Sequence, residues 1–134
     1  MPHAVSYLED DGIVFCEYTL PYGPHDFPVA IADNLVVAAE HGSHLFLADC
    51  RPLGTQGSLI DAYGMGELLD KMVADRHARE ALVIVPDTRT GEIFDFLVTV
   101  TTNRGLIMRV FAGIDEAKVW LREQGRELEK VLNE

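Results

Sequence analysis

The chain has 134 residues, a length that buries a hydrophobic core without the support of metals or disulfides. Hydrophobic residues make up 48% of it, which excludes an intrinsically disordered chain. The formal net charge of −11 argues against a nucleic-acid partner, because phosphate backbones are bound by patches of Lys and Arg.

The composition also bears on where the protein works. The longest apolar runs, such as residues 81–85, are too short to span a bilayer, so we expect no transmembrane segment. The first residues lack the basic and apolar regions of a signal peptide. Only two cysteines are present and their spacing is not that of a metal site, so we expect a cytoplasmic protein with reduced thiols.

The first third of the chain predicts a β-hairpin followed by a helix. Residues 4–9 and 12–20 are rich in strand-forming types around Asp11-Gly12, a typical hairpin turn. Asp26 suits the start of a helix and Gly42 suits its end, and the apolar residues between them have helical spacing.

The middle of the chain predicts two buried strands with a helix between them. Residues 45–49 are an apolar run ending in Asp49, as in strands buried on both faces of a parallel sheet. Ser58, with Asp61 three residues later, approximates a capping box and predicts the start of the helix. Residues 81–85 predict the next strand.

Residues 90–103 fit two structures. The β-branched run at residues 98–102 favours a strand, whereas apolar residues at helical spacing favour a helix. Residues 81–85 and 106–111 both resemble parallel strands, and a parallel pair needs a crossover connection. We therefore predict a helix over residues 90–103.

Apolar residues at helical spacing from Ala117 to Leu132 predict a long terminal helix that Gly125 interrupts. One small domain leaves some of the apolar residues beyond Gly125 uncovered, which favours a homodimer. The predicted order is ββαβαβαβα, which indicates a single α/β domain over residues 1–134 with a mixed sheet of four to five strands flanked by helices.

Three stretches of the chain resemble the SpoIIAA-like, or STAS-like, family. Residues 47–51, Leu-Ala-Asp-Cys-Arg, resemble that family's strand ending in Asp-x-Arg, and residues 81–87 resemble its next strand. Residues 108–111, with the Ala, Trp and Leu of the following segment, resemble its closing strand and helix. With the order of elements, the resemblance covers almost the whole chain.

The resemblance implies a four- or five-stranded sheet with helices beside it and a function as an anti-sigma-factor antagonist. In those antagonists the strand Asp is followed nine residues later by a phosphorylatable Ser, and Asp49 and Ser58 keep that offset. The sequence around that Ser is Asp-Ser-x-Gly in the antagonists and Gly57-Ser58-Leu59-Ile60 here. The SpoIIAA-like branch is also likened to lipid-binding domains of the Sec14 type.

Four residues are therefore candidates for a regulatory or partner-binding site. Ser58 is either a phosphorylation site, whose phosphate would meet free amides at a helix start, or a plain helix cap. Asp49 lies where open α/β sheets present their ligand-binding loops, and Arg51 is close enough to pair with it; a turn cap is the alternative. Asp61 completes the set.

Catalysis and cofactor binding have weaker support. Cys50 as a nucleophile would need a positive surrounding and a His base, and a small packed Cys is the alternative. His25, His41 and His44 lack the spacing and the further ligands of a metal site. No combination of nucleophile, base and orienting residue is visible, so we expect no enzyme, no metal and no cofactor.

We therefore expect a non-enzymatic regulatory or protein-interaction domain, regulated by phosphorylation at Ser58, whose partner is a kinase or an anti-sigma-like factor. The alternative is a module that binds a small apolar ligand or a lipid. In that case the side chains Met65, Met72, Phe94 and Phe96 would line its cavity, although the same pattern suits an ordinary core.

Overall fold

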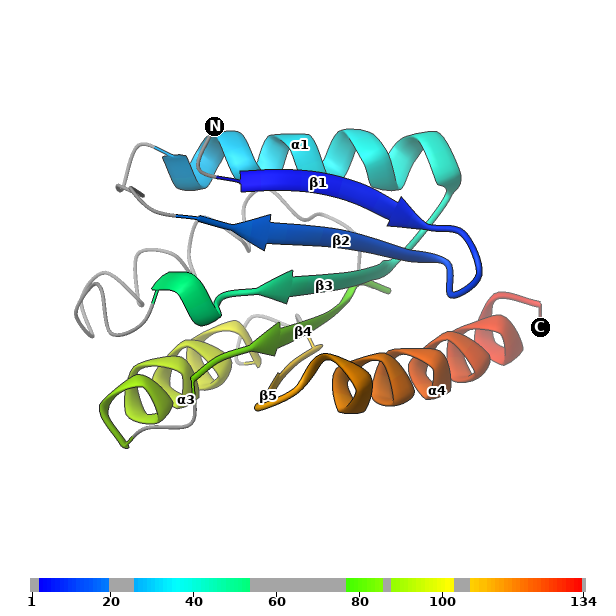
Figure 1. Ribbon diagram of the computed structural model, residues 1–134. Coiled ribbons are helices and arrows are strands. Elements are labelled where there is room, and N and C mark those ends of the chain that lie inside the picture. Colours follow the sequence, from blue (N-terminus) through cyan, green and yellow to red (C-terminus); the bar gives the residue numbers. More distant parts are fainter. Residues whose placement is uncertain (1–2, 20–25, 54–76, 86–87, 103–106, 134) are drawn as a thin grey trace.

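The computed structural model describes residues 3–19, 26–53, 77–85, 88–102 and 107–133. These residues form an α/β domain with one five-stranded mixed sheet, as the sequence predicted (Figure 1). The strands are β1 (His3–Leu8), β2 (Ile13–Tyr18), β3 (Leu45–Asp49), β4 (Arg79–Val83) and β5 (Ile107–Phe111). The helices are α1 (Asp26–His41), α3 (Thr88–Thr102) and α4 (Ile114–Leu132), with the short 3₁₀ helix η1 (Arg51–Leu53).

The strands lie in the sheet in chain order, from β1 at one edge to β5 at the other. β1 and β2 pair antiparallel through the predicted hairpin, with Gly12 in its turn at a φ of 69°. The pairs β2–β3, β3–β4 and β4–β5 are all parallel. The carboxyl ends of four strands therefore meet at one end of the sheet, and their amino ends meet at the other.

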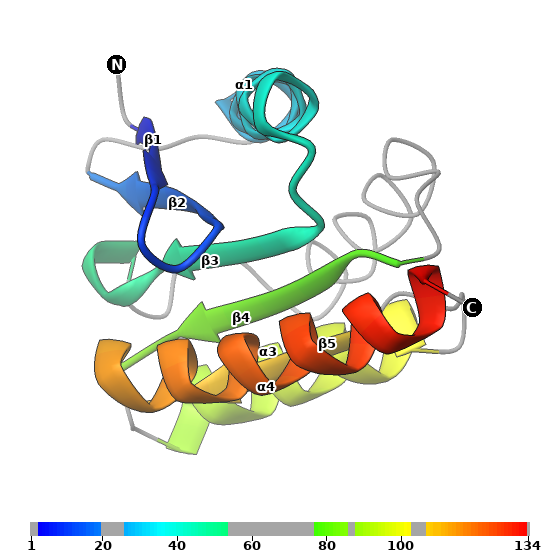
Figure 2. The ribbon, with the colours of Figure 1, turned by 90° about the vertical axis from the view of Figure 1, so that its right-hand side faces the viewer.

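Figure 2 shows α1 beside β1 and β2, and α4 beside β4. α1 packs on β1 and β2, and α3 packs on β5. Both contribute side chains to the same core cluster, which lies on one face of the sheet and includes Val14, Cys16 and Tyr18 of β2. α4 packs on β3, β4 and β5 and closes a second cluster on the opposite face, with Ile13 of β2 in it. Side chains along β2 therefore alternate between the two clusters.

Two predictions for the C-terminal half were tested directly. Residues 88–102 are helical despite their β-branched run, because α3 is the crossover between the parallel strands β4 and β5. α4 continues through Gly125, so the predicted interruption is wrong. A Cβ at Gly125 would lie 3.2 Å from Cδ1 of Leu45, so the missing side chain allows the helix to approach the start of β3.

The last turns of α4 are only partly covered by the domain. Leu128 is buried, whereas Val131 and Leu132 are 55% and 50% exposed. The sequence predicted such uncovered apolar residues beyond Gly125. Within the part of the chain that the structure describes, no helix is both long and apolar enough to cross a membrane.

Candidate functional site

Asp49 lies at the carboxyl end of β3, close to the middle of the sheet. It is in register with Glu17 of β2 and Val83 of β4. The next residue continues the sheet's hydrogen bonding, because the Cys50 amide donates to the carbonyl of Val83 at 2.8 Å. η1 then turns the chain and brings Arg51 back beside Asp49. The pairing with Arg51 and the turn cap, which the sequence offered as alternatives, are both present, because Asp49 accepts from the side chain and from the backbone amide of Arg51.

The two side chains form a bidentate ion pair. Arg51 donates from Nε to Oδ1 of Asp49 at 2.8 Å and from Nη2 to Oδ2 at 2.9 Å. The backbone amide of Arg51 also donates to Oδ1, at 3.2 Å. These bonds fix the planar guanidinium in one orientation, which a single contact would not do.

The partners differ in their exposure to water. The side chain of Asp49 is 14% exposed and that of Arg51 is 46% exposed. The hydrogen bond from Arg51 holds the pKa of Asp49 below its ordinary value, against the effect of burial. Asp49 is therefore ionised at neutral pH and positions the arginine. Arg51 keeps further N–H donors, whose geometry suits a carboxylate or a phosphate.

The other two candidates of this site, Ser58 and Asp61, lie outside the described residues, as does the predicted helix that Ser58 would begin. Met65 and Met72 of the predicted apolar cavity lie there too. Phe94 is 9% exposed in the core cluster beneath α1 and α3, and Phe96 packs against that cluster. Phe94 thus belongs to the core and Phe96 packs against it, which agrees with the ordinary core that the sequence offered instead of a cavity lining.

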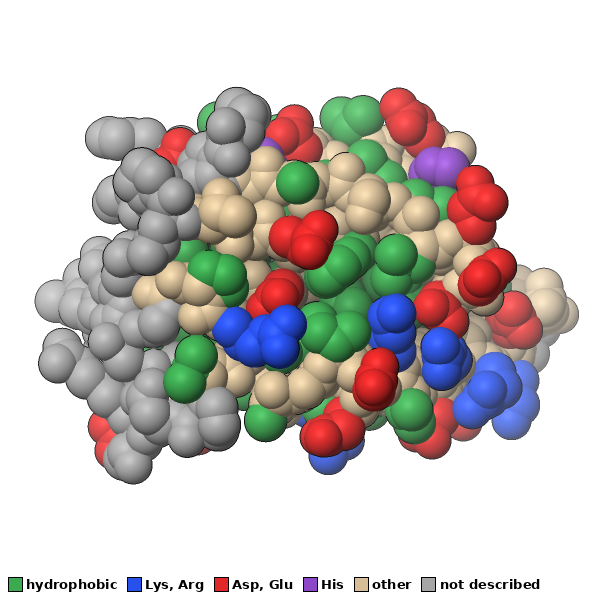
Figure 3. Space-filling view, viewed as in Figure 1, with side chains coloured by type: hydrophobic (Ala, Val, Ile, Leu, Met, Phe, Trp, Pro, Cys, Tyr) green, Lys and Arg blue, Asp and Glu red, His purple; other side chains and the backbone are tan. Residues whose placement is uncertain are grey.

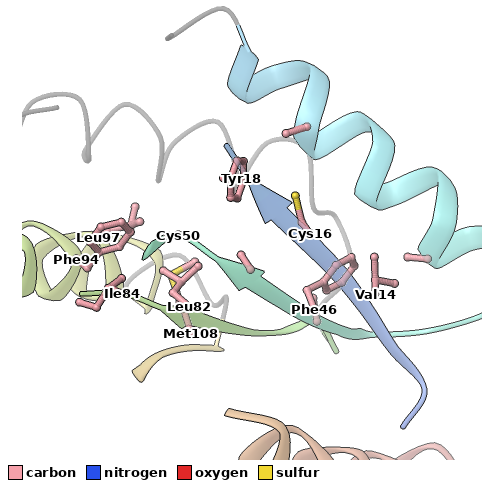
Figure 4. Packing of buried hydrophobic residues seen from close by; sticks show 14 residues of the cluster. Val14, Cys16, Tyr18, Phe46, Cys50, Leu82, Ile84, Phe94, Leu97 and Met108 are labelled. Atoms are coloured by element: carbon pink, nitrogen blue, oxygen red, sulfur yellow. The ribbon is translucent and has the colours of Figure 1, made fainter. Parts of the chain in front are cut away.

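Both cysteines are buried, free thiols on the α1 face of the sheet (Figure 4). Burial raises the pKa of Cys16 to about 11 and that of Cys50 well above its ordinary value. Such thiols are protonated at neutral pH, and only the thiolate is a good nucleophile. Cys50 therefore packs as a small hydrophobic residue.

Glu80 is an unusual group that sequence reasoning missed. It lies on β4 between Phe46 and Met108, on the face of the sheet that carries the two thiols. Burial raises the pKa of its carboxyl to about 8. The sequence did offer a signal, which is the position of this Glu directly before the apolar run at residues 81–85. The predicted strand began at residue 81 and so left Glu80 out.

The histidines that the structure describes do not gather into a metal site. His41 ends α1 and stacks on the ring of Tyr7, with centroids 3.8 Å apart and planes 6° from parallel. His44 meets His77 edge to face at 5.8 Å. His25 lies outside the described residues. No group of three metal-ligating side chains occurs among the residues whose positions the structure gives.

A cavity of about 430 Å³ lies at the opposite end of the sheet from Asp49. The β1–β2 turn, the turn between α1 and β3, and the second half of α4 form its walls. Ser43 joins the first two walls, because its hydroxyl donates to the carbonyl of Gly12 at 2.6 Å. Arg122 joins the first and the third, through Nε to Oδ1 of Asp11 at 2.6 Å. These contacts link residues far apart in the chain, and no local sequence motif predicts them.

Comparisons with known proteins place the chain in no group. No family model matches it, and no curated protein or solved structure matches it either. The candidate site therefore rests on its own geometry, which is a fixed and half-exposed guanidinium at the carboxyl edge of a mixed sheet.

Proposed function

We propose that this chain is a regulatory domain of the STAS-like type that binds a protein partner through the edge of the sheet at Asp49 and Arg51. The observation that carries the proposal is the bidentate pair, in which a largely covered carboxylate orients a half-exposed guanidinium. A guanidinium that is already oriented loses little side-chain freedom when it binds, so it suits recognition of a carboxylate or phosphate.

The order of elements and the mixed sheet are consistent with the resemblance to anti-sigma-factor antagonists. The proposal includes regulation at Ser58, which follows Asp49 by nine residues. A phosphate there would add about −1.5 to −2 charge to the segment that continues from Arg51. The partner is then an anti-sigma-like factor or a serine kinase. We place the domain in the cytoplasm, where free thiols such as those of Cys16 and Cys50 persist.

Binding by a matched pair of variants tests the role of Arg51. The chain offers a close control, because Arg122 also pairs with an aspartate and its side chain is 47% exposed, against 46% for Arg51. Arg122 lies at the opposite end of the sheet. Proteins captured on the wild-type domain from cells that express it would be purified and titrated by calorimetry against wild type, Arg51→Ala and Arg122→Ala.

We expect Arg51→Ala to weaken binding of the partner about tenfold or more, because a charged hydrogen bond at the interface is lost. Arg122→Ala should bind as wild type does. If both variants lose affinity equally, or neither does, the binding surface is not the edge at Arg51.

The regulatory part has its own test. Intact mass of the protein isolated from growing cells should show a species heavier by one phosphate that Ser58→Ala abolishes. Ser58→Asp should change the affinity for the captured partner, whereas Ser58→Ala should leave it close to wild type. Equal affinities for the two variants, together with an unmodified mass, would remove phosphorylation from the proposal.

A further inference from the structure

The cavity opposite Asp49 carries an inference that does not depend on the proposed function. Its apolar part comes from Leu45, Leu128 and Leu132, and charged side chains of α4 and the β1–β2 turn surround it. Leu132 is half exposed there, and Val131 beside it is 55% exposed. An apolar floor with a polar rim is the usual composition of a surface that another molecule covers.

The charges around the cavity are only partly paired. Arg122 is held by Asp11, as described above. Arg126 and Glu129, on the same wall, and Asp10, on the facing turn, form no ion pair within the described part of the chain. The rim therefore offers both an unpaired cation and unpaired carboxylates. A purely acidic partner would meet Arg126 but would be repelled by Asp10 and Glu129.

The net charge of the whole molecule limits which partners can approach this surface. With a net charge of −11, two copies repel each other over most of their surface. Four of the eleven basic residues lie on α4, each four positions after the one before. Figure 3 shows Lys and Arg side chains in a row over this helix, with acidic side chains between them. These residues are Lys118, Arg122, Arg126 and Lys130. The second half of α4 is thus a surface on which acidic and basic groups alternate.

We propose that this surface, the cavity rim formed by α4 and the β1–β2 turn, binds a second copy of the same chain about a twofold axis. Such an interface places the same patch on both sides, so a patch with both signs of charge is complementary to itself. Arg126 and Glu129 are three residues apart and so are neighbours on one side of the helix. With two α4 helices antiparallel, Arg126 of each copy faces Glu129 of the other.

Charge-reversal variants test this pairing. Arg126→Glu brings carboxylates together and Glu129→Arg brings guanidinium groups together, so each variant should raise the dimer dissociation constant about tenfold or more. Glu129→Arg is the sharper of the two, because it reduces the magnitude of the net charge from −11 to −9 and so reduces the general repulsion. If it weakens the dimer, local pairing and not net charge is responsible. The double variant should recover the wild-type constant, and the two single variants should form a heterodimer when mixed.

Sedimentation equilibrium over a range of concentrations measures these constants. Lys118→Glu is the control, because it makes the same change of net charge as Arg126→Glu on the same helix but does not line the cavity. It should dimerise as wild type does. A wild-type protein that stays monomeric at every concentration would overturn the proposal, as would single variants that dimerise as strongly as wild type. The cavity would then belong to a zwitterionic ligand or to a different protein.

Discussion

Replacing Glu80 with Gln tests how the core of this protein holds a buried carboxyl. Burial raises the pKa of Glu80 from 4.5 to about 8, so between these values the folded state keeps a proton that the unfolded chain has released. Stability therefore falls as pH rises, by about 1.4 kcal/mol for each pH unit in that window.

Glu80→Gln has the same shape and no proton to lose. The buried amide has a cost of its own, about 1–3 kcal/mol where it lacks a hydrogen-bond partner, but this cost does not change with pH. The free energy of unfolding of the variant, minus that of wild type, should therefore increase by about 3 kcal/mol between about pH 5.5 and pH 8.5. Other titrating groups cancel in the difference.

Urea denaturation of both proteins at several pH values measures this difference. Glu17→Gln on β2 is the control, because it removes a carboxylate from an exposed position and so reports the effect of the lost charge alone. The reasoning would be refuted if the difference in free energy of unfolding between wild type and Glu80→Gln stayed constant over the whole pH range. It would mean that the Glu80 carboxyl reaches water in the folded protein.

Three further predictions concern the core and the backbone. Cys16 and Cys50 should react with a thiol reagent only as fast as the protein unfolds, because both are buried and protonated; rapid labelling of the native protein would contradict this. Gly42→Ala should destabilise the protein by about 1 kcal/mol because the φ of Gly42 is 63°. Gly91→Ala inside α3 should stabilise it by up to about 1 kcal/mol. Chemical denaturation measures both, and changes of the same sign would contradict the prediction. Leu121→Ala should cost about 2–5 kcal/mol in the same assay, since Leu121 is fully buried, and a loss below about 1 kcal/mol would show a loosely packed α4.

The sequence predicted the sheet well because its strongest signals are local. The apolar run that ends in Asp49 predicted a buried strand over residues 45–49, and these are the bounds of β3. The helix at residues 90–103 followed from topology and not from propensity, and the structure has α3 there. The helix prediction used the rule that two adjacent parallel strands are joined by a crossover connection.

The remaining differences come from contacts that join distant parts of the chain. Gly125 would weaken a helix by itself, but α4 packs so closely on Leu45 that the glycine is accommodated within it. Arg122 and Asp11 are 111 residues apart, and their ion pair helps to build a cavity that no motif predicts. The pair of Asp49 and Arg51 was predictable because the two residues are only two positions apart and a turn follows the strand.

The most direct test of the proposed function is the affinity of the purified partner for the domain with and without the oriented arginine. Calorimetric titration of that partner against wild type, Arg51→Ala and Arg122→Ala gives three dissociation constants under one set of conditions. The fixed guanidinium at the carboxyl edge predicts a constant for Arg51→Ala at least about tenfold above the other two. Three equal constants would contradict it.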